Sequence, residues 1–336
     1  MEDAVQLDVS DDSICTEDLN DFIYNKNPFT YPYKSIHIEC DFIGGQSFTE
    51  IEFPAQDVTL CTGKPNINGL VFCVEPGDKK IVYLWRSCNG GKESGHYLHC
   101  LHSFLTTYKM GAGHLTLSHD RGGHLHNQIV MRYYHLITSA SSRKGERFFF
   151  DIEVYPYTTG HSGNTADRIS CLFEQAFRRR NQRFFTLDDR VQVINDDFPG
   201  IDVHIVENFL NIPDVLKRSG VYLNLRSQPD LTLKGHIGVG LLSMKPLSWE
   251  FGWSEKYSKE TDEYGYRRHQ DQLWVRNSTD INAPRRRFWL VAKKWRGKKL
   301  PFFFKSFNKS KMKKPGMQRK MFAKMKEYAR IFAQHD

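Results

Sequence analysis

The chain has 336 residues, and 40% of them are hydrophobic, enough to bury a sizeable core in one large domain or two ordinary ones. No stretch approaches the ~20 apolar residues that a membrane-spanning helix needs, and the acidic start lacks the basic and apolar regions of a secretory signal. The seven cysteines lack paired spacing, which indicates reduced thiols in a nuclear or cytoplasmic protein and argues against secretion.

The net charge of +8 is unevenly distributed along the chain. Residues 285–326 hold 17 Lys or Arg and no Asp or Glu, so the rest of the chain carries 30 basic against 39 acidic residues. A segment this basic favours a polyanionic partner, because Lys and Arg neutralise phosphates and release counterions. The alternative is a solvated tail that aids solubility or nuclear import.

The first part of the chain predicts a flexible segment followed by three strands. Residues 1–33 are acidic, then rich in Asn, Tyr and Pro, and show no periodicity. Alternation of apolar and polar residues over 36–42 predicts a strand that ends at the Gly44-Gly45 pair. Two apolar runs, 69–74 and 80–86, are joined by turn-forming residues and predict a hairpin.

Helices and strands then alternate. The spacing of apolar residues predicts helices over 93–110, 127–139 and 166–180, and strands over 114–119 and 148–155. This order of elements is that of the ribonuclease-H-like fold: a strand, a hairpin of two strands, and then helix, strand, helix, strand and helix. In that fold the first and fourth strands are neighbours. Beyond residue 195 the pattern weakens, with a helix over 203–219 interrupted by Pro213, strands at 235–242 and 288–292, and an irregular stretch over 255–282.

Acidic residues fall at the ends of the predicted strands. Asp41 and Asp120 close the first and fourth strands, Asp167 opens the last helix, and Glu174 lies two turns further along it. Carboxylates are hard oxygen ligands suited to Mg²⁺ or Mn²⁺, and a pair of such ions can clamp the attacking and leaving oxygens of a phosphodiester. Asp is also common in turns and at helix starts, which is the alternative for each residue.

The stretch 36–180 resembles a eukaryotic transposon-derived domain of the DDE-type transposases, which have a ribonuclease-H-like core. Three motifs carry the resemblance. They are a strand ending in Cys40-Asp41-Phe42, the turn Ser-His-Asp-Arg-Gly-Gly at 118–123 followed by His126-Asn127, and Gly-His-Ser at 160–162 shortly before the helix-opening Asp167.

The resemblance implies a two-metal site. Asp41, Asp120 and Asp167 would hold two Mg²⁺ or Mn²⁺ ions with His161 beside them, and Glu174 is the other candidate for the third ligand. The turn after Asp120 reads Gly-His-Leu-His-Asn where the family has Gly-Gln-Asn-Lys-Asn. This departure favours a second interpretation, a domesticated, inactive module that binds nucleic acid or a protein. A third is an unrelated α/β protein.

We therefore predict an α/β, ribonuclease-H-like core over 34–195, with a mixed sheet flanked by helices, and a basic α+β extension over 196–336. The chemistry would be hydrolysis or strand transfer at DNA phosphodiesters. Basic residues in two segments would hold the DNA backbone without reading its sequence. They are Arg178, Arg179, Arg285, Arg286, Arg287, Lys293, Lys294, Arg296, Lys298 and Lys299.

Overall fold

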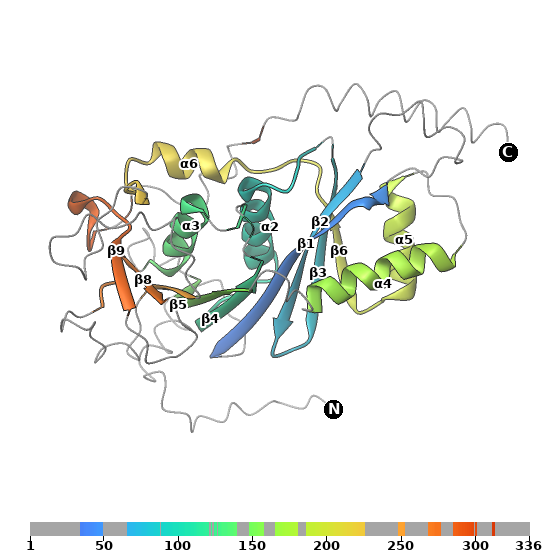
Figure 1. The fold of residues 1–336 in the computed structure, drawn as a ribbon, viewed down its shortest axis with the longest axis horizontal. Helices are drawn as coiled ribbons and strands as arrows, with labels where there is room; N and C mark the ends of the chain where they lie inside the picture. Colours follow the sequence, from blue (N-terminus) through green and yellow to red (C-terminus); the bar gives the residue numbers. More distant parts are fainter. Residues whose placement is uncertain are drawn as a thin grey trace.

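Nine strands form one mixed sheet in the order β6-β3-β2-β1-β4-β5-β7-β8-β9 (Figure 1). They are β1 Ser35–Thr49, β2 Asn66–Glu75, β3 Lys79–Arg86, β4 Ala112–His119, β5 Phe149–Pro156, β6 Ile201–Ile205, β7 Ser248–Gly252, β8 Gln272–Arg276 and β9 Arg285–Trp289. The structure is a computed structural model that describes residues 34–49, 66–87, 89–120, 122, 124–125, 127–139, 148–157, 165–180, 186–225, 248–252, 268–276, 285–298, 300 and 311–312.

The centre of the sheet combines antiparallel and parallel pairs. Strand β2 pairs antiparallel with both β1 and β3. Strand β4 pairs in parallel with both β1 and β5. The first and fourth strands are therefore direct neighbours, as the sequence predicted. The β1–β4 ladder ends where Cys40, inside β1, pairs with His119, the last residue of β4.

Among the described residues, five α-helices pack against the sheet, and a short 3-10 helix, η4, follows β9. Helices α2, α3 and α6 share a core with one face, whereas α4 and α5 share a second core with the other (Figure 1). Their bounds are α2 Ser94–Thr107, α3 Gln128–Thr138, α4 Thr165–Arg179, α5 Leu187–Asp197, α6 Ile212–Arg218 and η4 Lys293–Trp295.

Strand β2 shows how one run of apolar residues feeds both cores. Leu70 and Phe72 belong to the α2–α3 core, whereas Val71 and Cys73 belong to the α4–α5 core. Successive side chains of a strand point to opposite faces, so a strand covered on both sides is apolar throughout. This explains why the hairpin was readily predicted from its composition.

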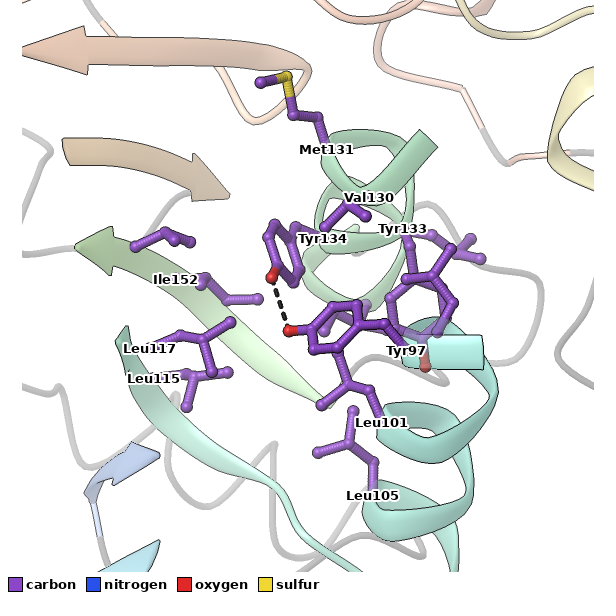
Figure 2. Packing of buried hydrophobic residues seen from close by; sticks show 14 of the residues in the cluster. Tyr97, Leu101, Leu105, Leu115, Leu117, Val130, Met131, Tyr133, Tyr134 and Ile152 are labelled. Atoms are coloured by element: carbon purple, nitrogen blue, oxygen red, sulfur yellow. Dashed lines mark hydrogen bonds between the residues drawn. The ribbon is translucent and has the colours of Figure 1, made fainter. Parts of the chain in front are cut away.

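The larger core lies between α2, α3, β4 and β5 (Figure 2). Leu115 and Leu117 of β4 and Ile152 of β5 face the helices there. Two tyrosines lie inside this apolar layer, Tyr97 of α2 and Tyr134 of α3, and their hydroxyl oxygens are 2.7 Å apart. The hydrogen bond satisfies both buried hydroxyls and so removes the cost of leaving either without a partner.

The chain departs from the predicted elements at several places. Strand β1 continues past Gly44 to Thr49, so the glycine pair does not end the strand as predicted. The pairing of β1 with β2 shifts register between Gly44 and Thr49. The predicted helix over 203–219 was wrong in its first part, which is β6. Pro213 lies in the first turn of α6 and starts that helix, because the first helical N–H groups have no intrahelical acceptor to lose.

Helix α5 was not predicted, although its start has a clear local cause. The Thr186 hydroxyl accepts from the N–H of Asp189, and the Asp189 carboxylate accepts from the N–H of Thr186. This reciprocal arrangement satisfies two backbone donors that a helix start otherwise leaves open.

The strands beyond residue 195 extend the same sheet. Strand β6 adds to β3 at one side, and β7, β8 and β9 add beyond β5 at the other, so both predicted parts of the chain share one sheet. Strand β8 lies within the stretch 255–282 that was predicted to be irregular. The strand predicted at 235–242 lies outside the described residues. Across the described parts of the chain, no helix combines the length and apolar character needed to span a membrane.

Candidate functional site

The parallel register of β1 and β4 puts two aspartates at neighbouring positions. Cys40 pairs with His119 at the end of the β1–β4 ladder, and the next residues of the two segments are Asp41 and Asp120. Neighbouring strands are about 4.8 Å apart. Both aspartates are partly exposed. The sequence predicted that they would be neighbours at comparable depth in the sheet, and this register agrees with that expectation.

Alternation along β1 fixes which face of the sheet Asp41 occupies. Ile43, two residues further on, is buried in the α4–α5 core. Glu39, two residues earlier, accepts a hydrogen bond of 3.0 Å from the backbone N–H of Thr165, the first residue of α4. Asp41 lies between these two on the same face. The site is therefore on the side of the sheet that carries α4.

The bond from Glu39 anchors the start of α4 to β1. A carboxylate at this position also interacts favourably with the positive end of the helix dipole. Asp167 lies in the first turn of α4, two residues beyond the anchored Thr165, and is partly buried. The helix start that carries Asp167 is thus fixed on the Asp41 face of the sheet.

Glu174, the other candidate for the third ligand, lies further along α4. Its carboxylate forms an ion pair of 3.6 Å with Arg178, one turn on. Seven residues separate it from Asp167, about 10 Å along the helix axis. Since the start of α4 is the part bonded to β1, the arrangement favours Asp167. His161 lies outside the described residues.

Sequence reasoning did not select Lys92, a lysine near Asp41. Lys92 lies in the loop between β3 and α2 and is partly buried. Burial lowers the pKa of its ammonium group, and the negative charge of nearby Asp41 acts in the opposite direction. The Gly-Gly-Lys sequence directly before a helix was the signal that could have identified it.

A histidine, His124, was also missed. Its ring lies edge-to-face against Phe42, with 4.9 Å between ring centroids. Burial lowers the pKa of His124, the charge of nearby Asp120 raises it, and Lys92 lowers it further. Lys92 and His124 therefore interact electrostatically with the two aspartates and with each other. The Gly-rich turn after Asp120 was the available signal.

His119, directly before Asp120, has a different role. Its Nδ1 donates to the carbonyl oxygen of Asp120 at 2.6 Å, and the ring is fully buried in the α2–α3 core. Burial lowers its pKa to about 4, so the imidazole is neutral near pH 7. The bond restrains the backbone carbonyl of Asp120 directly after β4.

The predicted DNA-binding residues on β9 lie far from Asp41 and Asp120. Strand β9 is five strands from β1, about 24 Å at the usual strand spacing of ~4.8 Å. Arg285 bonds Glu250 at 3.1 Å, Arg287 is buried, and the Arg296 guanidinium lies 3.7 Å from the Trp289 ring centroid. Arg286 is partly exposed on the same strand.

The exposed members of this basic set are lysines and two arginines of α4. Lys293, Lys294 and Lys298 lie at and just beyond η4. Arg178 and Arg179 are exposed at the end of α4, where Arg178 also pairs with Glu174. Lys299 lies outside the described residues.

Within the described ranges, no group of three or more His, Cys, Asp or Glu side chains is arranged to hold a metal ion. No known protein family matches the chain, and neither a curated protein nor a solved structure is detectably similar to it. In its described residues the protein is an α/β protein with one mixed nine-stranded sheet and helices on both faces.

Proposed function

We propose that this protein acts on DNA phosphodiesters, by metal-dependent hydrolysis or strand transfer. The observation that carries the proposal is the register of β1 and β4, which makes Asp41 and Asp120 the next residues after a paired Cys40 and His119. Open α/β sheets bind ligands at the carboxyl ends of their strands. Asp120 follows the carboxyl end of β4, and Asp41 lies at the neighbouring position within β1. Their carboxylates would supply the hard oxygen donors that Mg²⁺ and Mn²⁺ prefer.

The strand order supports the same proposal. Strands β3-β2-β1-β4-β5, with β2 antiparallel to its neighbours and β1, β4 and β5 parallel, follow the order of the ribonuclease-H-like fold. In DDE-type transposases, which the motifs around Asp41, Asp120 and Asp167 resemble, a carboxylate on a later helix completes the site. Helix α4 carries Asp167 in its first turn and is bonded to Glu39 of β1, which supports Asp167 as that carboxylate.

Each residue then has a defined part in the proposed mechanism. Asp41 and Asp120 would hold one ion, and Asp167 would hold the second. Bound ions of this kind activate water or a 3′-hydroxyl and stabilise charge on the phosphate. Glu39 keeps the start of α4 against β1. The lysines at η4 would bind the DNA backbone at a distance from the reacting phosphate.

A second candidate function is an inactive, transposase-derived module that binds nucleic acid. Two observations favour it. No group of three ligands is assembled among the described residues. The ammonium group of Lys92 also interacts with Asp41, so part of the negative charge is already balanced without a divalent ion.

Nicking of supercoiled DNA in the presence of Mn²⁺ separates the two functions. We expect wild-type protein to nick the DNA and Asp120→Asn to lower the rate roughly 100-fold or more, the scale of losing one charge contact in the transition state. Asp188→Asn is the control, because Asp188 is a largely exposed carboxylate on α5, away from β4. Equal rates for wild type and Asp120→Asn would reject the catalytic assignment, and DNA binding without cleavage in any metal would favour the inactive module.

A further inference from the structure

Two side chains able to donate hydrogen bonds lie near the aspartates, and neither has a part in the two-metal proposal above. They are Lys92, from the loop before α2, and His124, from the turn before α3. The ring of His124 contacts Phe42, the residue after Asp41, and the charge of Asp41 acts on Lys92. We propose that Lys92 and His124 bind the phosphate group of the nucleic-acid backbone at the Asp41–Asp120 edge of the sheet. This inference rests on the proposed function and deepens it, because it assigns the residues that hold the substrate anion.

The position of Lys92 is set by a firmly held backbone. The indole N–H of Trp85 donates to the carbonyl oxygens of Gly90 and Gly91, at 3.1 and 3.3 Å. The side-chain amide of Asn68 also donates to Gly90 at 3.1 Å. Trp85 and Asn68 are themselves buried in the sheet. The loop that presents Lys92 is therefore fixed before any ligand arrives, which reduces the entropy cost of binding.

The ring of His124 is held from two sides. Phe42, the residue after Asp41, contacts one edge of it. On another side the ring packs over Gly122, so closely that a Cβ atom at that position would lie 2.3 Å from Cε1 of His124. The backbone is held as well, because the Asn127 side chain donates to the His124 carbonyl oxygen at 3.0 Å while also capping α3.

Charge explains why such residues are needed at this edge. Two neighbouring carboxylates repel a phosphodiester, and a cation in the same site offsets that repulsion. An ammonium group donates up to three hydrogen bonds, and an imidazole ring has at least one N–H in either tautomer. Lys92 and His124 interact electrostatically with the carboxylates from separate segments. Non-bridging phosphate oxygens accept bonds from both.

The test uses a trinucleotide, which is too short to reach from the carboxylates to β9. Its affinity is measured by NMR titration with Ca²⁺ present, and nicking of plasmid DNA is measured with Mn²⁺. Lys92→Met removes the charge. His124→Phe keeps a ring against Phe42 and Gly122 but removes the N–H, whereas His124→Gln restores a donor. Lys217→Met, at an exposed position on α6, and His204→Phe, at a half-buried position on the distant strand β6, are the controls.

We expect Lys92→Met and His124→Phe each to weaken trinucleotide binding by roughly five- to tenfold, the loss of one charge-assisted or neutral hydrogen bond to phosphate. His124→Gln should recover part of the loss, which a purely structural role would not explain. The control variants should bind as the wild type does, and all variants should keep the wild-type melting temperature within a few degrees.

The outcomes separate this inference from the proposed function. Wild-type cleavage together with unchanged kcat, KM and trinucleotide affinity in both variants would overturn the phosphate contacts and leave the nuclease function standing. Absence of cleavage in any metal, with binding still weakened by Lys92→Met and His124→Phe, would reject the nuclease function and retain the contacts. If His124→Gln binds no better than His124→Phe, the assignment of His124 is wrong.

Discussion

The imidazole of His135, on α3, lies 3.0 Å from the carboxylate of Asp271, the residue before β8, and both side chains are buried. The other oxygen of Asp271 accepts a bond of 2.6 Å from the backbone N–H of Gly297. His135 also lies 3.2 Å from the Tyr222 hydroxyl. One buried pair thus connects the central helices to the segments around β8 and η4.

Asp271→Asn should lower the stability at neutral pH by about 2 kcal/mol, because a charged hydrogen-bond acceptor is lost from a buried network. Urea unfolding at pH 7 measures the effect. Asp202→Asn is the matched control, since its carboxylate is exposed on β6.

The same pair should make stability depend on pH in the acid range. Burial alone would raise the pKa of Asp271, but the bond and charge of His135 and the N–H of Gly297 outweigh it and lower the pKa below its usual value. A carboxyl group with a depressed folded-state pKa stabilises the fold above its unfolded pKa of about 3.9 and loses this contribution as the pH falls through the folded value. The stability gap between wild type and Asp271→Asn should therefore shrink below about pH 4. A gap that stays constant down to pH 2 would contradict this assignment.

Glu250→Gln should be strongly destabilising. The fully buried Glu250 carboxylate of β7 bonds Arg268 at 2.7 Å, Arg276 at 3.0 Å and Arg285 at 3.1 Å. Removing its charge leaves buried guanidinium groups without their shared counterion, which costs on the order of 3–5 kcal/mol when a buried pair is broken. Thermal unfolding measures the loss. Glu207→Gln, at an exposed position, should change the melting temperature by no more than a degree or two.

Glu39→Gln should loosen the start of α4 while leaving the sheet intact. The variant exchanges a carboxylate for an amide as acceptor of the Thr165 N–H, and we expect a loss of about 1 kcal/mol. Hydrogen exchange of the amides in the first turn of α4 should accelerate, whereas those of β4 should not. Uniform acceleration across both elements would show that Glu39 supports the whole fold and does not act specifically on this helix.

Gly252→Ala should destabilise the junction of β7 and β5. Gly252 has a φ of 77°, and an added Cβ atom would lie 2.3 Å from the carbonyl oxygen of Phe150. Strain in this region costs on the order of 1–3 kcal/mol, and the clash adds to it. Gly200→Ala is the control, because nothing lies within 4 Å of a Cβ there. Similar urea midpoints for the two variants would contradict the proposed strain.

Secondary structure was easiest to predict from the sequence where the local residue pattern matches the burial of the element in the fold. The apolar strands at the centre of the sheet and the capped start of α3 at Asn127 carry their own signals, so their positions could be predicted. Strands β7 and β8 could not. Their inward residues include Glu250, Arg276 and Gln272, which are buried only because other segments supply ionic partners. A strand with buried charges has no apolar alternation to detect.

The same limit applies to the candidate site. Asp41 and Asp120 could be predicted as neighbours because each lies on or directly after a readable strand, although β1 continues beyond Asp41 to Thr49. Lys92 and His124 lie in loops whose position depends on bonds to Trp85, Asn68 and Asn127. These long-range contacts cannot be read from spacing along the chain. The choice between Asp167 and Glu174 likewise depends on Glu39, a contact across 126 residues of sequence.

The path of the chain after α5 limits where this protein could be shortened. Beyond α5, strand β6 pairs with the free hydrogen-bonding edge of β3, and β7 later pairs with the free edge of β5. A fragment ending at residue 195 would expose unpaired N–H and C=O groups along both of these strands. Such open borders pair readily with other copies and lead to aggregation. Truncations that aim to isolate the carboxylate-bearing half should therefore precipitate, even though every proposed ligand would still be present.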